Sequence, residues 1–160
     1  MTGNTMKNLF TVGLLTIALA ACGQKATTSS QNSMGGVSSE SAASEAGYLT
    51  ENVLDRVFFD TDQSSLSAEA RNILRSQAGW LKANASLSVV IEGHADERGT
   101  REYNLALGAR RATAVRDALM SYGVSGGQIA TISYGKERPV SLCSADSCWS
   151  KNRRAVTTIR

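Results

Sequence analysis

The segment of residues 87–123 reads LSVVIEGHADERGTREYNLALGARRATAVRDALMSYG and carries the clearest structural pattern of the chain. Apolar side chains alternate at its start, so residues 87–94 are predicted to form a half-buried strand. A charged loop follows, and residues 101–122 then show the apolar spacing of a helix. Gly123 stands where a helix C-terminal cap belongs. A strand joined by a short loop to a long helix is the central unit of an α/β fold.

Shorter patterns on both sides extend this unit. The run RVFFD over residues 56–60 predicts a first strand, and Ser67 is expected to cap a helix with Glu69 in its first turn. That helix carries one stripe at helical spacing, made of Ala70, Ile73, Leu74, Gln77, Ala78 and Leu81. IATISYG (129–135) and RRAVTTI (153–159) predict two more strands, with a loop between them. The order βαβαββ predicts an α/β sandwich in which the helices pack on one face of the sheet.

The amino terminus reads MTGNTMKNLFTVGLLTIALAACGQK, with an apolar run over residues 9–21 behind a lysine. The run is too short to span a bilayer comfortably and is typical of a secretory signal peptide. The small residues directly before Cys22 resemble the bacterial lipobox, which implies cleavage after Ala21 and lipids on Cys22. A plain secretory signal with an incidental cysteine is the alternative, and either Met1 or Met6 is the start.

We therefore divide the chain into a signal peptide (1–21), a tether that begins with the lipidated cysteine (22–47) and one folded domain (48–160). The tether is rich in serine and has few large apolar side chains, so it is expected to be disordered. Gly23 is not the aspartate associated with inner-membrane retention, which favours the outer membrane. Apolar residues make up 42% of the chain, and the net charge of +3 is scattered. So weak a charge argues against nucleic-acid binding.

Two further cysteines, Cys143 and Cys148, belong to the folded domain. In an oxidising compartment such a close pair favours a disulfide. A zinc pair is the competing interpretation, but zinc needs about four ligands. The chain has a single histidine, His94. A site made of His94, Asp96 and Glu97 would need ligands converging from adjacent loop positions, and no His-x-x-x-His pattern supports it, so no metal site is predicted.

The charged loop and the helix after it hold the candidate site. At roughly 100° per residue, Arg111 falls in the middle of the apolar face of the helix, and Asn104 lies on the same face. A buried guanidinium needs a partner, and Asp96, just past the strand end, is the best candidate. Glu97 and Arg98 are expected to face water at the loop tip. The Asp96–Arg111 pair could merely pin the loop to the helix, or its two charges could hold a zwitterion.

A catalytic role is poorly supported by the residues. His94 stands alone, and no serine lies in a nucleophile elbow. A hydrolytic site would need a nucleophile, a base and an orienting group. We interpret His94 as a hydrogen-bonded residue at a strand end rather than a base. We therefore expect that this protein is not an enzyme and has no cofactor.

Several ordered motifs resemble the OmpA-like peptidoglycan-binding domain over about residues 53–160. They are Phe58-Phe59-Asp60 with Asp62, IEGHADERGTREYN (91–104), the helix pattern from Asn104 to Leu119, SYGKERP (133–139) and SKNRRAV (150–156). The lipobox and the serine-rich tether make the chain most similar to the lipid-anchored members of that family. One departure is Gly108, where many members carry serine. A helix glycine is expected to cost about 1 kcal/mol against alanine.

The resemblance implies a four-stranded mixed sheet and non-catalytic binding of peptidoglycan through the zwitterionic end of meso-diaminopimelate. It implies that Asp96 and Arg111 grip that side chain. It also implies a pocket lined by Asn104, Phe59, Asp60, Thr61, His94 and Ala95. The same resemblance implies a tether between the cell wall and the periplasmic face of the outer membrane in a Gram-negative bacterium. That tether would act in the Tol–Pal system during cell division, with TolB as a protein partner. A peptidoglycan-modifying hydrolase and a purely structural lipoprotein are the alternatives.

Overall fold

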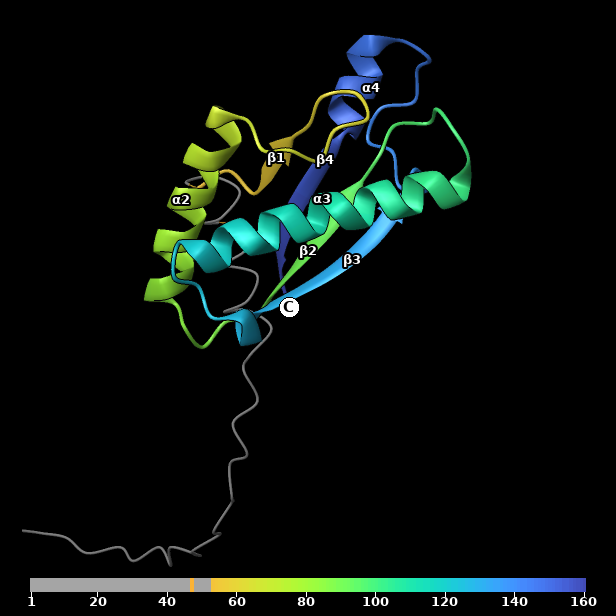
Figure 1. The fold of residues 1–160 in the computed structure, drawn as a ribbon. Coiled ribbons are helices and arrows are strands. Elements are labelled where there is room, and N and C mark those ends of the chain that lie inside the picture. Colours follow the sequence, from red (N-terminus) through yellow and green to blue (C-terminus); the bar gives the residue numbers. More distant parts are fainter. Residues whose placement is uncertain (1–46, 48–52) are drawn as a thin grey trace, which may run out of the picture. The chain divides into compact units, whose positions relative to one another are not determined.

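The computed structural model describes residue 47 and residues 53–160 (Figure 1). The expected signal peptide, the lipidation of Cys22 and the serine-rich tether up to residue 46 lie outside the described residues. The elements in chain order are β1 (Arg56–Phe58), α2 (Ala68–Ala83), β2 (Val89–His94), α3 (Arg101–Ser121), a 3-10 turn (Gly126–Gln128), β3 (Ile129–Gly135), α4 (Asp146–Asn152) and β4 (Arg154–Ile159).

The four strands form one sheet in the order β1-β4-β2-β3. β2 and β3 run parallel, whereas β4 is antiparallel to both of its neighbours, β1 and β2. The predicted four-stranded mixed sheet is therefore confirmed. Because β2 and β3 are parallel, their carboxyl ends meet at one edge of the sheet, and the loops that follow His94 and Gly135 lie together there.

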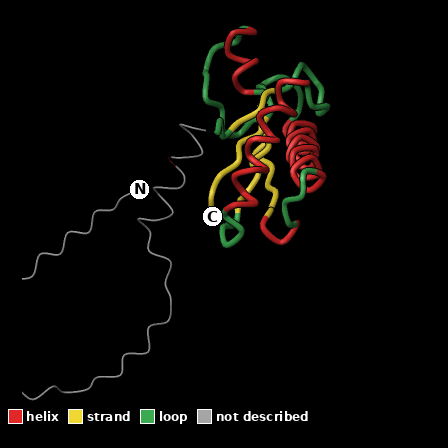
Figure 2. The backbone as a smooth tube through the Cα atoms, turned by 90° about the vertical axis from the view of Figure 1, so that its left-hand side faces the viewer, coloured by secondary structure: helices red, strands yellow, loops and turns green. Residues whose placement is uncertain are grey.

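Helices α2 and α3 cover the same face of the sheet, as predicted (Figures 1 and 2). Each begins at a hydroxyl cap: the Ser67 side chain accepts the N–H of Ala70, and the Thr100 side chain accepts the N–H of Tyr103. α3 ends at Ser121, with Tyr122 as its C-cap, and Gly123 follows at φ +92°. The core between the layers is formed by Val57, Phe59, Ala70, Leu74, Ala78, Leu81, Val89, Ile91, Ala112, Val115, Leu119, Val124, Ile129 and Ala155.

Helix α3 lies unusually close to strand β2 because a glycine on each meets the other. A Cβ added at Gly93 would overlap the carbonyl oxygen of Gly108, and one added at Gly108 would overlap the Ser133 hydroxyl and lie 2.8 Å from the Gly93 carbonyl. We expected Gly108 only to lower the stability of the helix relative to alanine, and this expectation is wrong. The missing side chain is what lets the helix approach the sheet.

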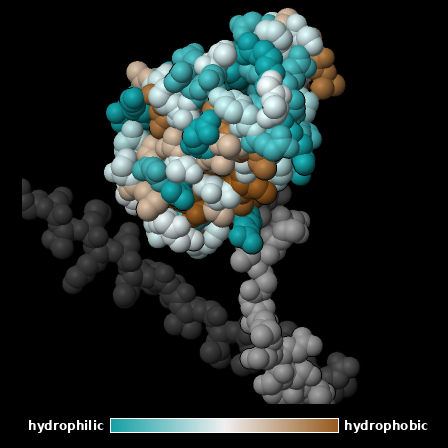
Figure 3. All heavy atoms as spheres, turned by 45° about the vertical axis from the view of Figure 1, so that its right-hand side comes forward, coloured by the Kyte–Doolittle hydropathy of each residue, from teal (hydrophilic) through white to brown (hydrophobic). Residues whose placement is uncertain are grey.

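The loop expected before the last strand contains a helix, α4, which the sequence analysis missed. Its seven residues, DSCWSKN, are too few and too polar to show helical periodicity. The predicted disulfide is present between Cys143 and Cys148, whose Cα atoms are 5.6 Å apart. On the face in Figure 3, the upper end of the molecule, where Figure 1 places α4, is mainly hydrophilic.

None of the helices in the described part of the chain has the length and hydropathy needed to cross a membrane.

Candidate functional site

Two loops, β1–α2 and β2–α3, enclose a cavity with the first turns of α3. This cavity, which we call the Asp96 cavity, has a volume of about 310 Å³. Its lining consists of Thr61, Asp62, Asp96, Arg98, Gly99, Tyr103, Asn104 and Leu107. The predicted site residues Asp96, Asn104 and Thr61 are thus brought together, although they lie on three separate segments.

Asp96 is the buried carboxylate of this cavity, with 7% of its surface exposed. The Arg98 guanidinium binds both carboxylate oxygens, with Nη2 2.6 Å from Oδ2 and Nε 3.1 Å from Oδ1. Arg153 lies 3.5 Å from Oδ2. Burial alone would raise the pKa of Asp96, but hydrogen bonds from the Arg98 side chain and backbone bring it below its ordinary value. The group is therefore an anion at neutral pH.

Arg111 is completely buried, as its place on the helix predicted. Its guanidinium donates to three backbone carbonyls: to Gln63 at 2.8 Å, His94 at 2.8 Å and Asp60 at 3.1 Å. Burial lowers the pKa of Arg111 to about 10, so it stays charged at neutral pH. No ion pair joins Arg111 to Asp96 within the described residues, so the hypothesis of a pinning salt bridge between them is wrong.

Arg111 is not among the residues that line the Asp96 cavity. Its guanidinium carbon is 5.1 Å from the centre of the Phe59 ring, which covers one side of it. Nη1 and Nη2 each carry two N–H groups, and each uses one of them on a carbonyl. The charge therefore contributes positive potential behind the cavity and fixes the loops that form it.

His94 does not make the side-chain hydrogen bonds expected of a strand-end residue. Both ring nitrogens are buried without a hydrogen-bond partner among the described residues. Burial, then the charges of Arg154 and Arg138, lower its pKa to about 4. Glu92 lies 3.6 Å away, but an imidazole with this pKa is neutral at pH 7, so the two form no ion pair there. The His94 carbonyl serves as scaffold for Arg111.

Arg98 does not simply face water, contrary to our expectation. Besides holding Asp96, its guanidinium lies over the Trp149 ring at 4.2 Å and reaches the Thr61 hydroxyl at 3.4 Å. Asn104 donates to the Arg98 carbonyl at 2.7 Å and so fixes the same loop. Arg98 therefore supplies the cation that lies directly beside both oxygens of Asp96.

Glu97 is exposed at the loop tip, as expected, but it is not free. It accepts a hydrogen bond from Nε1 of Trp149 at 3.0 Å. Hydrogen bonds from Ser144 and Trp149 lower the pKa of Glu97 below its ordinary value. Helix α4 and the disulfide loop before it therefore support the loop that carries Asp96 and Arg98.

Four lining residues were not predicted from the sequence: Asp62, Gly99, Tyr103 and Leu107. Tyr103 donates from its hydroxyl to Asp62, and both residues line the Asp96 cavity. Asp62 has φ +60°, a left-handed conformation that is uncommon for a residue other than glycine. The family-like Phe58-Phe59-Asp60-x-Asp62 motif was the one sequence signal that could have found Asp62.

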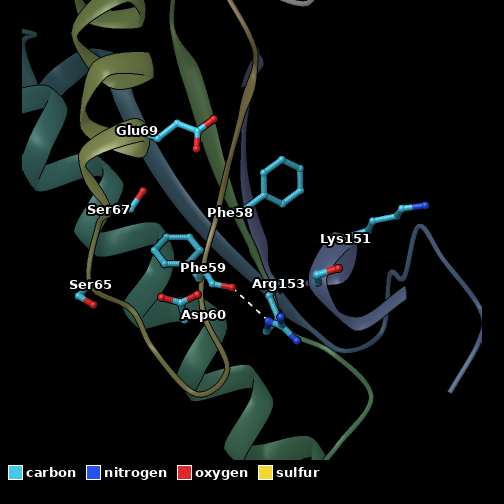
Figure 4. A pocket seen from close by; sticks show the side chains of 9 residues that line it. Phe58, Phe59, Asp60, Ser65, Ser67, Glu69, Lys151 and Arg153 are labelled. Atoms are coloured by element: carbon cyan, nitrogen blue, oxygen red, sulfur yellow. Dashed lines mark hydrogen bonds between the residues drawn. The ribbon is translucent and has the colours of Figure 1, made fainter. Parts of the chain in front are cut away.

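Two of the predicted residues, Phe59 and Asp60, line a second cavity next to the first (Figure 4). This Phe58 cavity has a volume of about 480 Å³. Its wall is made of Phe58, Phe59, Asp60, Ser65, Ser67, Glu69, Ser150, Lys151 and Arg153. Arg153 stands between the two cavities, because its Nε donates to the Phe59 carbonyl at 3.1 Å and its Nη1 points to Asp96. Of the other predicted residues, Ala95 is buried and donates its N–H to Gly135.

No cluster of histidine, cysteine and acidic side chains that could hold a metal ion occurs within residues 47 and 53–160. The arrangement offers instead a buried anion and two nearby guanidinium groups. Such a set can hold ammonium and carboxylate groups of one ligand by charge-assisted hydrogen bonds.

The family model described as "OmpA family" matches residues 58–153. Curated proteins named peptidoglycan-associated lipoprotein are similar over most of the chain. The protein from Mesorhizobium japonicum is 53% identical over 147 residues, covering 89% of this chain and 86% of the relative. The protein from Haemophilus influenzae is 40% identical, covering 94% and 95%.

Solved structures agree with this similarity. The crystal structure of the peptidoglycan-associated lipoprotein from Burkholderia pseudomallei is 41% identical, has a TM-score of 0.67 and covers 69% of this chain and 95% of its own. The C-terminal domain of Helicobacter pylori MotB, at 20% identity and a TM-score of 0.62, covers 66% of this chain and 84% of its own and shares the fold alone. The chain belongs to the OmpA family and, within it, to the peptidoglycan-associated lipoproteins. These relatives are named for an association and not for a reaction, in agreement with the expectation of a non-enzymatic protein.

Proposed function

We propose that this protein binds peptidoglycan non-covalently, through the zwitterionic end of meso-diaminopimelate in the stem peptides. The ligand would enter the Asp96 cavity. The observation that carries the proposal is the buried Asp96 carboxylate, which opens on a cavity and is held by a partly exposed arginine. The name of the relatives, which associates them with peptidoglycan, supports the same ligand.

The chemistry of the cavity suits a group with both charges. The ligand ammonium would replace the Arg98 guanidinium beside Asp96, exchanging one charge-assisted pair for another. The displaced Arg98 would then be free to meet the ligand carboxylate, with the buried charge of Arg111 behind it. Asn104 and Thr61 would complete the wall. Hydrogen bonds to both charges of the ligand would favour diaminopimelate over a side chain that bears only an amine.

We further propose that Cys22 is lipidated and holds the domain at the periplasmic face of the outer membrane. Residues 22–47 would act as the tether, so the protein would connect that membrane to the wall in a Gram-negative envelope. The lipobox and the lipoprotein relatives support this arrangement. A role in the Tol–Pal system during cell division, with TolB as partner, rests on the family resemblance. A Cys22→Ala chain that still floats with outer membranes would contradict the anchor.

Sedimentation with purified sacculi tests the wall proposal. We expect the detergent-solubilised chain to sediment with diaminopimelate-type sacculi and Asp96→Asn to stay in the supernatant. Asp117→Asn is the matched control, since Asp117 is an exposed helical carboxylate paired with Arg116 and remote from the cavity lining. Equal sedimentation of Asp96→Asn and the parent chain would contradict this site. Release of soluble muropeptides would favour a hydrolase, and no sedimentation of the parent would favour a structural lipoprotein.

A further inference from the structure

The Phe58 cavity is a separate compartment that shares one wall with the Asp96 cavity. Residues 59–60 face the former and residues 61–62 the latter, so a single short loop divides them. Arg153, with 8% of its side chain exposed, connects the two by contacting both Phe59 and Asp96. The two cavities are therefore neighbours on either side of the segment 59–62.

Several polar side chains without a hydrogen-bond partner in the described part of the chain line the Phe58 cavity. The carboxylates of Asp60 and Glu69 and the ammonium of Lys151 have no hydrogen-bond or ion-pair partner among the described residues. The same holds for the Ser65 hydroxyl and for Nη2 of Arg153, whose other nitrogens are used. Figure 4 shows Asp60, Glu69 and Arg153 around the same space. Asp60, Ser65, Glu69 and Lys151 are exposed, so the cavity offers their donors and acceptors to a polar ligand.

An exposed aromatic ring belongs to the same cavity. Phe58 is 48% exposed at the end of β1, whereas its neighbour Phe59 is buried in the core. In Figure 4 the two rings lie on opposite sides of the strand. A flat apolar surface beside hydroxyl, carboxylate and ammonium groups suits a ligand with one apolar face and a polar edge.

The charges of the cavity exclude a strongly anionic or cationic ligand. Asp60 and Glu69 oppose Lys151 and Arg153, so a phosphate would meet two carboxylates and an amine two cations. A pyranose ring is neutral, has C–H faces that stack on an aromatic ring, and has hydroxyl and acetamide groups that both donate and accept hydrogen bonds. We infer that the Phe58 cavity binds an amino sugar of the glycan strand, next to the stem peptide in the Asp96 cavity.

This inference rests on the proposed function, because it assigns a site to the glycan strand of the polymer whose stem peptide would bind in the Asp96 cavity. Sugar and stem peptide are covalently joined in peptidoglycan, and the two cavities share a wall. Phe58 would stack on the sugar ring, while Asp60 and Glu69 would accept hydrogen bonds from its hydroxyls. Lys151 and Arg153 would donate to the acetamide or ring oxygens.

Calorimetry with the full chain in detergent tests the inference, using two ligands. One is the free stem tripeptide with diaminopimelate, and the other is the disaccharide carrying the same peptide. We expect the disaccharide-peptide to bind about tenfold more tightly, equivalent to about 1.4 kcal/mol. Phe58→Ala and Glu69→Gln should each remove most of this difference while leaving the affinity for the free peptide unchanged.

Matched controls separate a specific contact from a general loss. Ile132→Ala removes a side chain of similar exposure from β3, at the opposite edge of the sheet. Glu102→Gln removes the first-turn carboxylate of α3, as Glu69→Gln does in α2. Both controls should keep the full tenfold difference. In NMR spectra, sugar C–H protons of the disaccharide-peptide should shift upfield with the parent chain but not with Phe58→Ala.

The outcomes distinguish this inference from the proposed function. Equal affinity of the two ligands, with Asp96→Asn weakening both, would overturn the sugar site and leave the peptide site standing. Weaker binding of the free peptide to Phe58→Ala would assign the cavity to peptide and also overturn the sugar site. Failure of both ligands to bind the parent chain would overturn the proposed function and the inference together.

Discussion

Arg111 is a buried cation whose three hydrogen-bond partners are backbone carbonyl oxygens. It joins residues that are far apart in the chain: Asp60 and Gln63 before α2, and His94 at the end of β2. The planar guanidinium can serve three acceptors in fixed directions, which a lysine ammonium on a flexible stem cannot. Its replacement therefore disturbs the fold as well as any ligand, so Arg111→Ala by itself cannot prove a binding role.

Arg111→Lys is expected to lower the free energy of unfolding by about 2–4 kcal/mol, because at least one buried carbonyl loses its donor and a cavity remains. Urea denaturation at pH 7 measures this change. Arg110→Lys is the control, since Arg110 is the exposed neighbour on the same helix, and it should stay within about 0.5 kcal/mol of the parent. Equal stability of both variants would contradict the bracing role of Arg111.

His94 predicts a pH dependence with a definite sign. Its folded pKa of about 4 lies below the unfolded value of 6.5, so the unfolded chain binds the proton first. The stability that the neutral ring contributes is complete above pH 6.5 and is lost as pH falls toward 4. At pH 5 the loss should be about 2 kcal/mol relative to pH 7.

His94→Phe should remove that part of the pH dependence, because phenylalanine keeps a ring in the site and has no proton to bind. Denaturation curves at pH 7 and pH 5 give the comparison. Asp96, whose folded pKa is lowered, loses its contribution only as pH falls below about 3.9, so it does not interfere in this window. A variant with the same pH 7 to pH 5 loss as the parent would rule out His94 as the source.

At the scale of elements, the approach of α3 to β2 depends on Gly93 and Gly108. Ridges of side chains usually keep a helix about 10 Å from a sheet, but here backbone meets backbone. The same chain contains a helix glycine without such a role: nothing lies within 4 Å of a Cβ added at Gly79 in α2. Gly79 and Gly108 can therefore be compared within one protein, because both are helical glycines and only Gly108 touches another element.

Gly79→Ala should raise the free energy of unfolding by about 0.5–1 kcal/mol, the usual gain for alanine over glycine in a helix. Gly108→Ala should lower it by about 1–3 kcal/mol, because the methyl group forces α3 away from Ser133 and the Gly93 backbone. Chemical denaturation of both variants decides the point. Stabilisation by both substitutions would contradict this, because it would mean that α3 and β2 can move apart at Gly108 without a loss of stability.

Helix α4 and its disulfide support the binding loop from outside. Trp149 contacts Glu97 and Arg98, and Cys148 precedes it directly in the chain. A disulfide limits the conformations of the loop that it closes. Removing it should therefore loosen Trp149 and, through it, the loop that holds Asp96.

In Cys143→Ser/Cys148→Ser, backbone amides of residues 96–100 should exchange with deuterium severalfold faster than in the parent chain, since their support is less rigid. Amides of residues 124–128 serve as an internal control, because that turn precedes β3 and lies at the opposite end of the sheet. Unchanged exchange in residues 96–100 would mean that α4 keeps Trp149 in place without the disulfide.

On the scale of the whole molecule, ligand binding should stabilise the fold. The Asp96 cavity joins the β1–α2 loop, the β2–α3 loop and the first turns of α3, so a ligand that fits only this arrangement favours the folded state. Stem tripeptide at 100 times its dissociation constant should raise the free energy of unfolding by about 2.7 kcal/mol. Thermal or urea unfolding with and without the peptide measures it. Asp96→Asn should show no such gain, and an equal gain in that variant would place the peptide elsewhere.

Much of this molecule could be predicted from local patterns. The four strands, the two long helices, the Ser67 cap and the burial of Arg111 all follow from residue spacing, because each is decided within one element. Helix α4 could not be predicted, since seven polar residues give no period. The role of Gly108 could not be predicted either, because it depends on the close contact of the helix with Gly93 and Ser133 on neighbouring strands.

Periods of two and 3.6 residues are properties of the local backbone, so the chain alone predicts the four strands, the two long helices and the face that each of them buries. Which charges meet depends instead on contacts between elements. Asp96 pairs with Arg98 and with Arg153, 57 positions away, while Arg111 takes carbonyls instead. The reason is physical: the Asp96–Arg153 pair and the carbonyls bound by Arg111 depend on which segments the fold brings together, and no local spacing encodes that arrangement.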